Sequence, residues 1–178
     1  DRYLIHYLQS SFLQAPTAVT SNKRVMIEYS SPNTNKPLHF GHLRNNFLGA
    51  AMASILKTQG HEVVKANLIN DRGIHICKSM IAWMRYANQA TPANTGIKGD
   101  HLVGDYYVKF NDIYKEEVAQ LMASGMEEAL AEKQAPILLE AQALLLKWEQ
   151  DDADTRALWK QMNDWVYEGF KATYERLG

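Results

Sequence analysis

The most constraining feature of the sequence is an alternation of strand and helix patterns between residues 24 and 69. Residues 24–29 are rich in apolar and β-favouring types and end at a cluster of turn-forming residues, as expected of a strand. Residues 43–60 carry apolar side chains at helical spacing and end at Gly60, which suits a helix C-terminus. Residues 61–69 have the pattern of a second strand. Two strands joined by a helix pair in parallel with a right-handed crossover, so this segment predicts the start of a doubly wound α/β sheet.

The remainder of the chain favours helices. After a helix over residues 74–87 and an irregular loop over 88–103, the pattern predicts three helices, near 105–123, 126–149 and 152–177. Pro136 is unsuited to a helix interior, so a break or a new helix is expected there. Residues 1–22 are expected to be a lead-in helix and connector. The predicted organisation is α/β, with a Rossmann-like, parallel-sheet nucleotide-binding half-domain over 23–88 and a mainly helical, insertion-type subdomain over 89–178.

Composition limits the classes of protein to which the chain can belong. The net charge is −1 and the isoelectric point is near 6.7, so nucleic-acid binding cannot be argued from bulk charge. A single cysteine, Cys77, excludes an intramolecular disulfide and fits a reducing compartment. No stretch approaches the roughly 20 apolar residues of a membrane span. The chain does not start with methionine or with a signal peptide, so a cytoplasmic piece of a longer protein is expected.

The loop over residues 30–42 carries the chemistry. It follows the first predicted strand, and ligands of open α/β sheets bind beyond the carboxyl ends of strands. The helix that follows offers free amide groups and a partial positive charge, both of which suit phosphate. Lys36, His39 and His42 add side-chain donors at this place, and Gly41 lets a flat group lie against the backbone.

These residues resemble a known family. The run His39-Phe40-Gly41-His42 looks like the H-x-G-H signature of class I aminoacyl-tRNA synthetases. The flanking residues narrow the resemblance to the arginyl branch, through three further segments: Glu28 to Asn33, Asn35-Lys36-Pro37 and Leu43-Arg44. A block from Asn67 to Gly73 lies where that family has its second strand and the following turn.

The resemblance implies a function in a parent enzyme. That function is ATP-dependent activation of L-arginine and its transfer to tRNA(Arg), and Mg²⁺ would accompany ATP without dedicated protein ligands. The family's motif places Lys36, His39, Gly41 and His42 at ATP. It implies that Lys36, His39 and His42 stabilise charge on phosphate in the transition state, with Lys36 standing in for the lysine of a later loop. The parent is expected to be a monomer, although the sequence does not fix the oligomeric state.

For the amino acid, the resemblance implies three ligands. Asn33 would lie near the α-amino or carboxylate group, and Glu28 near the guanidinium. Asp71 is a further candidate, although Arg72 follows it where several relatives have tryptophan. The chain has no K-M-S-K-S-like segment, and the second half of the nucleotide fold and the anticodon-binding domain are not in it. We therefore expect the isolated chain to be inactive.

Alternative interpretations remain open at this stage. A nucleotidylyltransferase also uses H-x-G-H on a Rossmann-like sheet, and a non-catalytic module for tRNA or protein contact would leave the motif unused. Among single residues, Glu28 fits a structural ion pair, Asn33 an ordinary turn residue, and Lys36 a solvated lysine.

For several other residues the sequence pattern favours a structural role over a functional one. His75 and Cys77 are too few for a zinc site, and Cys77 is expected to be buried in a helix. Residues 98–101 are predicted to be a structured loop, with contact to the tRNA acceptor end as the alternative. The aromatic residues of the last helices are expected to pack rather than to stack on bases; they are Trp148, Trp159, Trp165, Tyr167 and Tyr174.

Overall fold

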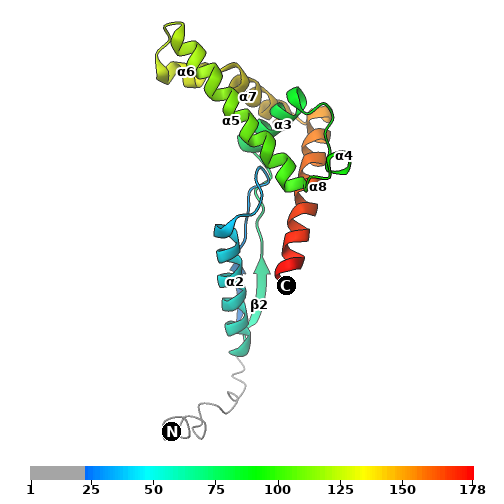
Figure 1. Ribbon diagram of the computed structural model, residues 1–178. Helices are drawn as coiled ribbons and strands as arrows, with labels where there is room; N and C mark the ends of the chain where they lie inside the picture. The colour runs from blue at the N-terminus through cyan, green and yellow to red at the C-terminus, as the bar shows by residue number, and fades with distance from the viewer. Residues whose placement is uncertain (1–22) are drawn as a thin grey trace, which may run out of the picture. The chain divides into compact units, whose positions relative to one another are not determined.

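The computed structural model describes residues 23–178 (Figure 1). Strands β1 (Arg24–Glu28) and β2 (Glu62–Ala66) pair in parallel, with Arg24 opposite Glu62 and Glu28 opposite Ala66. Helix α2 (Phe40–Thr58) connects them, so the predicted strand–helix–strand unit is confirmed. The helix and connector expected in residues 1–22 lie outside the described residues.

The described residues group into two compact units. The first unit contains residues 23–30 and Leu43–Leu68, and therefore both strands and most of α2. The second unit contains Ser31–His42 and Ile69–Gly178, and therefore the candidate loop and all the later helices.

In the first unit, α2 packs closely on the end of β1. The helix buries Asn46, Gly49 and Ala53. A Cβ atom at Gly49 would lie 2.3 Å from the Tyr29 ring, so only glycine lets the helix backbone approach that ring. The helix begins three residues before the predicted start, because Phe40, Gly41 and His42 form its first turn rather than the end of the loop.

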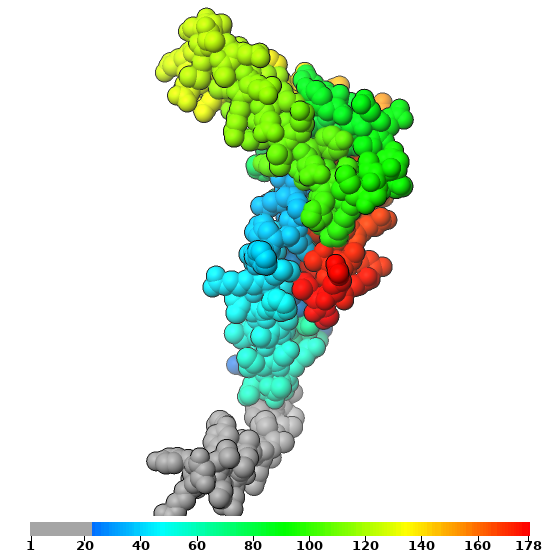
Figure 2. Space-filling view, in the orientation of Figure 1, coloured from blue at the N-terminus to red at the C-terminus, as the bar shows by residue number. Residues whose placement is uncertain are grey.

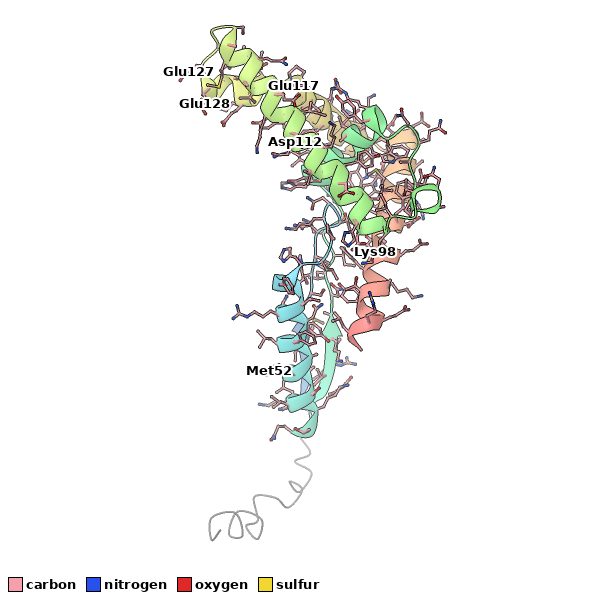
Figure 3. The ribbon with its side chains drawn as sticks, in the orientation of Figure 1. Met52, Lys98, Asp112, Glu117, Glu127 and Glu128 are labelled. Atoms are coloured by element: carbon pink, nitrogen blue, oxygen red, sulfur yellow. The ribbon has the colours of Figure 1, made fainter. Side chains whose placement is uncertain are left out.

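The first unit exposes large apolar side chains on both β1 and α2. They are Met26, Phe47, Leu48, Met52 and Ile55. Helix α2 is drawn in cyan in Figure 2, and Met52 is labelled on it in Figure 3. Parallel strands in α/β proteins are usually covered on both faces. This surface is therefore of the kind that further strands or helices cover.

The second unit is helical after the candidate loop. Its helices are α3 (Ile74–Tyr86), α4 (Pro92–Thr95), α5 (Gly99–Ala123), α6 (Glu128–Gln134), α7 (Pro136–Glu149) and α8 (Ala153–Leu177). Pro136 is the first residue of α7, which confirms that a new helix starts there. Glu117 of α5 accepts a hydrogen bond of 2.7 Å from the Ile137 backbone N–H and so completes this helix start (Figure 3).

Two helix starts differ from the sequence prediction. Short helix α4 lies inside the predicted loop, where Thr91 and Asn94 cap it reciprocally and Pro92 opens it. Helix α5 begins at Gly99, so residues 98–101 are a helix start and not the expected loop. Asp100 there is buried, and its carboxylate lies 3.0 Å from Lys98 Nζ. The Gly, Pro, Asn and Thr residues of 88–103 made this stretch look irregular in the sequence.

The core of the second unit brings α3 together with α5, α7 and α8. Its centre is built from buried side chains of all four helices, among them Met80, Phe110, Ile137 and Phe170. Trp159, Trp165 and Tyr174 pack against it and Trp148 is buried, so the prediction that these aromatic residues pack is confirmed for them.

Candidate functional site

The candidate loop is fixed to the loop that follows β2. The Asn70 backbone N–H donates to the Pro32 carbonyl at 3.0 Å, and the Thr34 N–H donates to the Asn70 carbonyl at 3.1 Å. The Asn70 side-chain amide also donates to Asn33 Oδ1 at 2.9 Å. The Asn33 side chain therefore also ties the two loops together. Its carbonyl oxygen is occupied, and its NH₂ group is the part left to bind a ligand.

A change of pairing register precedes this anchor. Paired residues of β1 and β2 differ by 62 − 24 = 38 positions, whereas Asn33 and Asn70 differ by 70 − 33 = 37. The first loop therefore contains one extra residue, and Ser30 and Ser31 absorb it with positive φ angles of 72° and 42°. Such conformations cost about 1–2 kcal/mol each for residues with a Cβ. Strained backbone of this kind concentrates at functional sites.

The two histidines of the loop form a pair with defined protonation. Their ring centroids are 4.0 Å apart. The Gly41 N–H donates to His39 Nδ1, and the His39 N–H donates to His42 Nδ1, both at 3.1 Å. A nitrogen that accepts a hydrogen bond carries no proton in the neutral ring, so the proton of each ring lies on Nε2. Both imidazoles therefore offer an N–H donor on the side away from the backbone.

The electrostatic surroundings keep His42 neutral. Burial lowers its pKa, and the charges of His39 and Lys36 lower it further. The same repulsion makes this place favourable for an anion, because a negative group among these side chains would relieve it.

The backbone of Lys36 and Pro37 packs directly against helix α5. A Cβ atom at Gly104 would lie 2.8 Å from Pro37 Cδ and 3.6 Å from Lys36 Cα, so the loop lies directly on the helix. Lys36 forms no ion pair with any carboxylate of residues 23–178. Gly104 could not be singled out from the sequence, because a glycine within a helix indicates a close approach only once its partner is known.

Asp71 is held by helix α8. The Tyr167 hydroxyl donates to Asp71 Oδ2 at 2.5 Å, and Trp159 Nε1 donates to the Asp71 carbonyl at 2.7 Å. Burial raises the pKa of Tyr167, and the Asp71 carboxylate raises it further, so the phenol stays protonated and keeps donating. The sequence predicted only packing for Tyr167, because nothing in its helical spacing pointed to a partner in a distant loop.

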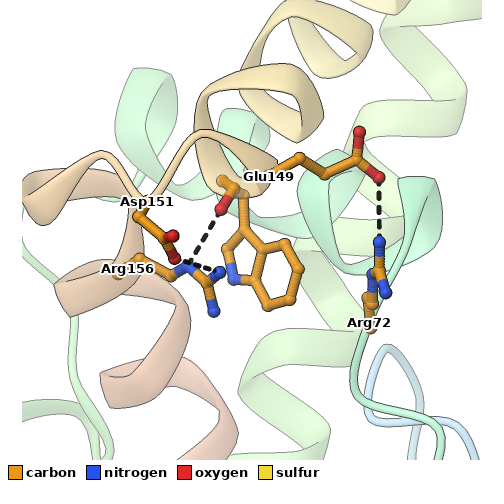
Figure 4. A network of polar contacts seen from close by, with 5 residues as sticks. Arg72, Glu149, Asp151 and Arg156 are labelled. Carbon is orange, nitrogen blue, oxygen red and sulfur yellow. Dashed lines mark hydrogen bonds and ion pairs between the residues drawn. The ribbon is translucent and has the colours of Figure 1, made fainter.

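Arg72 joins the same loop to helix α7 (Figure 4). Its guanidinium lies 5.2 Å from the centroid of the Trp148 ring and 3.1 Å from the Glu149 carboxylate. Arg156 stacks on the same indole at 3.6 Å and pairs with Asp151 at 2.6 Å. An arginine at position 72 therefore has a structural role here, as a cation stacked on an aromatic ring.

A family model described as "tRNA synthetases class I (R), catalytic domain" matches residues 5–178. The chain belongs to this class I arginyl-tRNA synthetase family. The match covers the helical second unit as well as the strand–helix–strand unit and the loop.

Members of the arginyl-tRNA synthetase family resemble the chain over most of its length. An arginine–tRNA ligase of Bacteroides thetaiotaomicron is 58% identical over 161 residues, which are 90% of this chain and 27% of that protein. One of Bacteroides fragilis is 60% identical over 154 residues, 86% of this chain and 26% of that protein. The chain thus spans about a quarter of the length of these relatives. The solved Thermus thermophilus arginyl-tRNA synthetase matches with a TM-score of 0.55 and 27% identity, over 89% of this chain and 22% of that one.

Within this arginyl-tRNA synthetase segment, the structure gathers most of the predicted site residues in the second unit. Lys36, His39, Gly41 and His42 lie on one loop and helix start, and Asn33 contacts Asn70, the residue before Asp71. Glu28 is the last residue of β1 and belongs to the first unit.

Residues 23–178 contain no candidate metal site and no candidate membrane span. No group of three or more His, Cys, Asp or Glu side chains lies close enough to hold a metal ion in this part of the chain. Among the same residues, none of the helices combines the length and apolar composition that a bilayer crossing needs.

Proposed function

We propose that the chain is the nucleotide-binding front part of the catalytic domain of an arginine–tRNA ligase. The observation that carries the proposal is the His39–His42 pair, with both Nε2–H groups free to donate at the start of α2. In the reaction, an arginine carboxylate oxygen attacks the α-phosphorus of ATP and the bond to the β-phosphate oxygen breaks. Pyrophosphate leaves, and a ribose hydroxyl at the tRNA 3′ end then displaces AMP from the arginyl adenylate.

The histidines and Lys36 would act on the charge that develops on phosphate. Donors that are fixed before the reaction each contribute about 10²–10³ in rate when they point at that charge. The hydrogen bonds from the loop backbone fix both imidazoles in this way, and Lys36 adds a cation that no carboxylate of residues 23–178 neutralises. Gly41 makes room for the His39 ring, since a Cβ there would lie 2.9 Å from His39 Cε1, and is assigned to ATP together with that ring. Mg²⁺ would enter with the ATP phosphates.

For L-arginine, we assign the Asn33 amide to the α-amino or carboxylate end, with Asp71 beside it. Glu28 is assigned to the guanidinium, which a carboxylate binds through two parallel charged hydrogen bonds. The proposal includes tRNA(Arg) as the acceptor, a cytoplasmic location where charging takes place, and a monomeric parent. It also places the division between the nucleotide half-domain and the helical subdomain near residue 88.

The deciding experiment is tRNA charging with [¹⁴C]arginine by the full-length parent carrying His42→Asn. We expect kcat/KM to fall by about 10²-fold or more, because a donor to the transition state is lost. His61→Asn is the matched control, since His61 directly precedes β2 and lies outside the loop. Full activity of His42→Asn would show that the motif is not catalytic and would favour a contact module.

The 178-residue chain by itself should bind ATP but not catalyse the reaction. Only the front part of the catalytic domain is present, so the 178-residue chain should not catalyse arginine-dependent pyrophosphate exchange, even with tRNA added. A backbone NMR titration with ATP separates binding from catalysis. Shifts confined to the segment from Lys36 to Arg44 would show that this chain already contains the nucleotide half-site.

A further inference from the structure

Helix α5 contacts the candidate loop and then helix α3 along one side. Gly104, Tyr107 and Phe110 are spaced three residues apart, so they follow one another along the same side of the helix. Gly104 lies under Lys36 and Pro37. Tyr107 OH lies 3.1 Å from His75 Nδ1 of α3, and Phe110 lies 5.4 Å below Lys78 Nζ of α3. The Lys36 backbone and the side chains of His75 and Lys78 thereby lie in a row along this side of α5.

No part of the proposed reaction uses His75, Lys78 or Tyr107. His75 and Lys78 are three residues apart on α3 and therefore share a face of that helix. His75 is exposed and Lys78 is half-buried, so a ligand from solvent can reach both. Tyr107 orients the His75 ring through Nδ1, which leaves the other ring nitrogen to face a ligand.

The charges of this row are not balanced within residues 23–178. No ion pair joins His75 or Lys78 to a carboxylate in this part of the chain, and α3 contains no acidic residue. Burial lowers the pKa of His75, and the charges of Lys78 and Lys36 lower it further. Burial also lowers the pKa of Lys78. Lys36 is thus close enough to act on His75 as well as on His42.

We infer that Lys36, His75, Lys78 and the Tyr107 hydroxyl form a second anion subsite, which binds a phosphate group beside the His39–His42 pair. The two lysines carry charge and donate to phosphate oxygens. When a bound anion protonates His75, its Nδ1–H donates to the Tyr107 oxygen, and Nε2–H and the phenol proton are then both available to the phosphate. The inference rests on the proposed function for the identity of the ligand. It extends that function by adding residues of α3 and α5, and Lys36 is shared between the two subsites.

Two phosphates of the proposed reaction have the required chemistry. One is the pyrophosphate end of the nucleotide, and the other is the last phosphodiester of an RNA 3′ end. Both are tested on the 178-residue chain by following the His75 imidazole in ¹⁵N–¹H NMR spectra. The first probe is inorganic pyrophosphate, and the second is an RNA hairpin with a 3′-CCA tail. A bound phosphate should move the His75 resonances and raise its pKa, because an anion favours the imidazolium among Lys36, Lys78 and Tyr107.

Single variants distinguish a specific phosphate site from nonspecific attraction of an anion to positive charge. Lys78→Met keeps the aliphatic packing on Phe110. It should weaken binding of whichever probe shifts the His75 resonances about tenfold or more, which is the loss expected for one charged hydrogen bond. Lys109→Met is the matched control, because Lys109 is an exposed lysine of the same helix as Tyr107. Tyr107→Phe should also weaken binding, and circular dichroism spectra establish that each variant keeps its helices.

The outcomes are distinct. A response to pyrophosphate that Lys78→Met weakens supports the subsite with the nucleotide as its ligand, and a response to the RNA alone supports it with the tRNA end. No shift of His75 with either probe, or equal weakening by Lys78→Met and Lys109→Met, overturns the inference. Charging by the full-length parent tests the proposed function separately, because a chain that binds pyrophosphate at His75 can still fail to charge tRNA.

Discussion

The Tyr167 hydroxyl donates a 2.5 Å hydrogen bond to Asp71 Oδ2, and this bond ties helix α8 to the loop that follows β2. Trp159 of the same helix binds the Asp71 backbone carbonyl, so the carboxylate and the main chain of one residue are fixed together. Asn70, which precedes Asp71, binds the candidate loop at Asn33. The orientation of a proposed arginine-binding loop therefore depends on side chains from the C-terminal helix.

Replacing Tyr167 by phenylalanine tests this dependence. The Tyr167→Phe chain should lose about 1–2 kcal/mol of unfolding free energy, because a half-buried hydrogen bond to a carboxylate is removed. In the full-length parent, the KM for arginine should rise more than kcat falls, since Asp71 is proposed to bind substrate. Urea unfolding and steady-state charging measure the two effects. An unchanged KM for arginine would contradict a positioning role.

The same bond predicts a dependence on alkaline pH. The pKa of Tyr167 is raised in the folded chain, so its contribution to stability is fully present below the ordinary tyrosine pKa near 10 and is lost as pH rises through the raised value. The unfolding free energy of the wild type should therefore decline above about pH 10, and Tyr167→Phe should flatten this decline.

Cys77 should be inert in the folded protein. It is buried in the core of the second unit, and burial raises the pKa of its thiol to about 11. Only the thiolate is nucleophilic, so a disulfide reagent at pH 8 should label the native chain at the rate of its unfolding. The urea-unfolded chain should react at once. Rapid labelling under native conditions would show that α3 opens locally or packs differently.

The α/β fold and the candidate loop could be predicted from the sequence because both depend on local pattern. The strand–helix–strand order follows from apolar spacing, and the His39–His42 motif is contiguous in the chain. What the sequence could not supply was contact between distant segments. Tyr167 looked like a packing residue until the structure placed it on Asp71. Arg72 stood out only as a difference from several relatives, and its contact with Trp148 became visible only in the structure. Gly104 did not stand out in the sequence, although it is the residue that lets the loop approach α5.

Gly104→Ala should separate the role of this contact from helix stability. An alanine would favour the helix by about 1 kcal/mol, yet its Cβ would lie 2.8 Å from Pro37 Cδ and push the loop away. We therefore expect helicity to be kept while Lys36 moves, so that the KM for ATP in the full-length parent rises. Far-UV circular dichroism and charging at varied ATP measure these quantities. Unchanged ATP kinetics would show that the loop adjusts without moving Lys36.

The protonation of His42 can be tested directly by NMR. Long-range ¹⁵N–¹H spectra of the chain should show the neutral ring protonated at Nε2, because the His39 N–H donates to Nδ1. Its pKa should lie below the ordinary value of about 6.5. Because this pKa is lowered, the contribution of His42 to stability is present above the ordinary value and is lost as pH falls through the lowered one.

A pair of lysine variants identifies the cause of the His42 shift. Lys36→Met should raise the His42 pKa only part of the way back, because burial is the largest cause and His39 remains in place. Lys65→Met, at an exposed position of β2, should leave it unchanged. If Lys36→Met left the His42 pKa where it was, Lys36 would lie too far from the histidine pair to share a phosphate with it, and its assignment to ATP would fail.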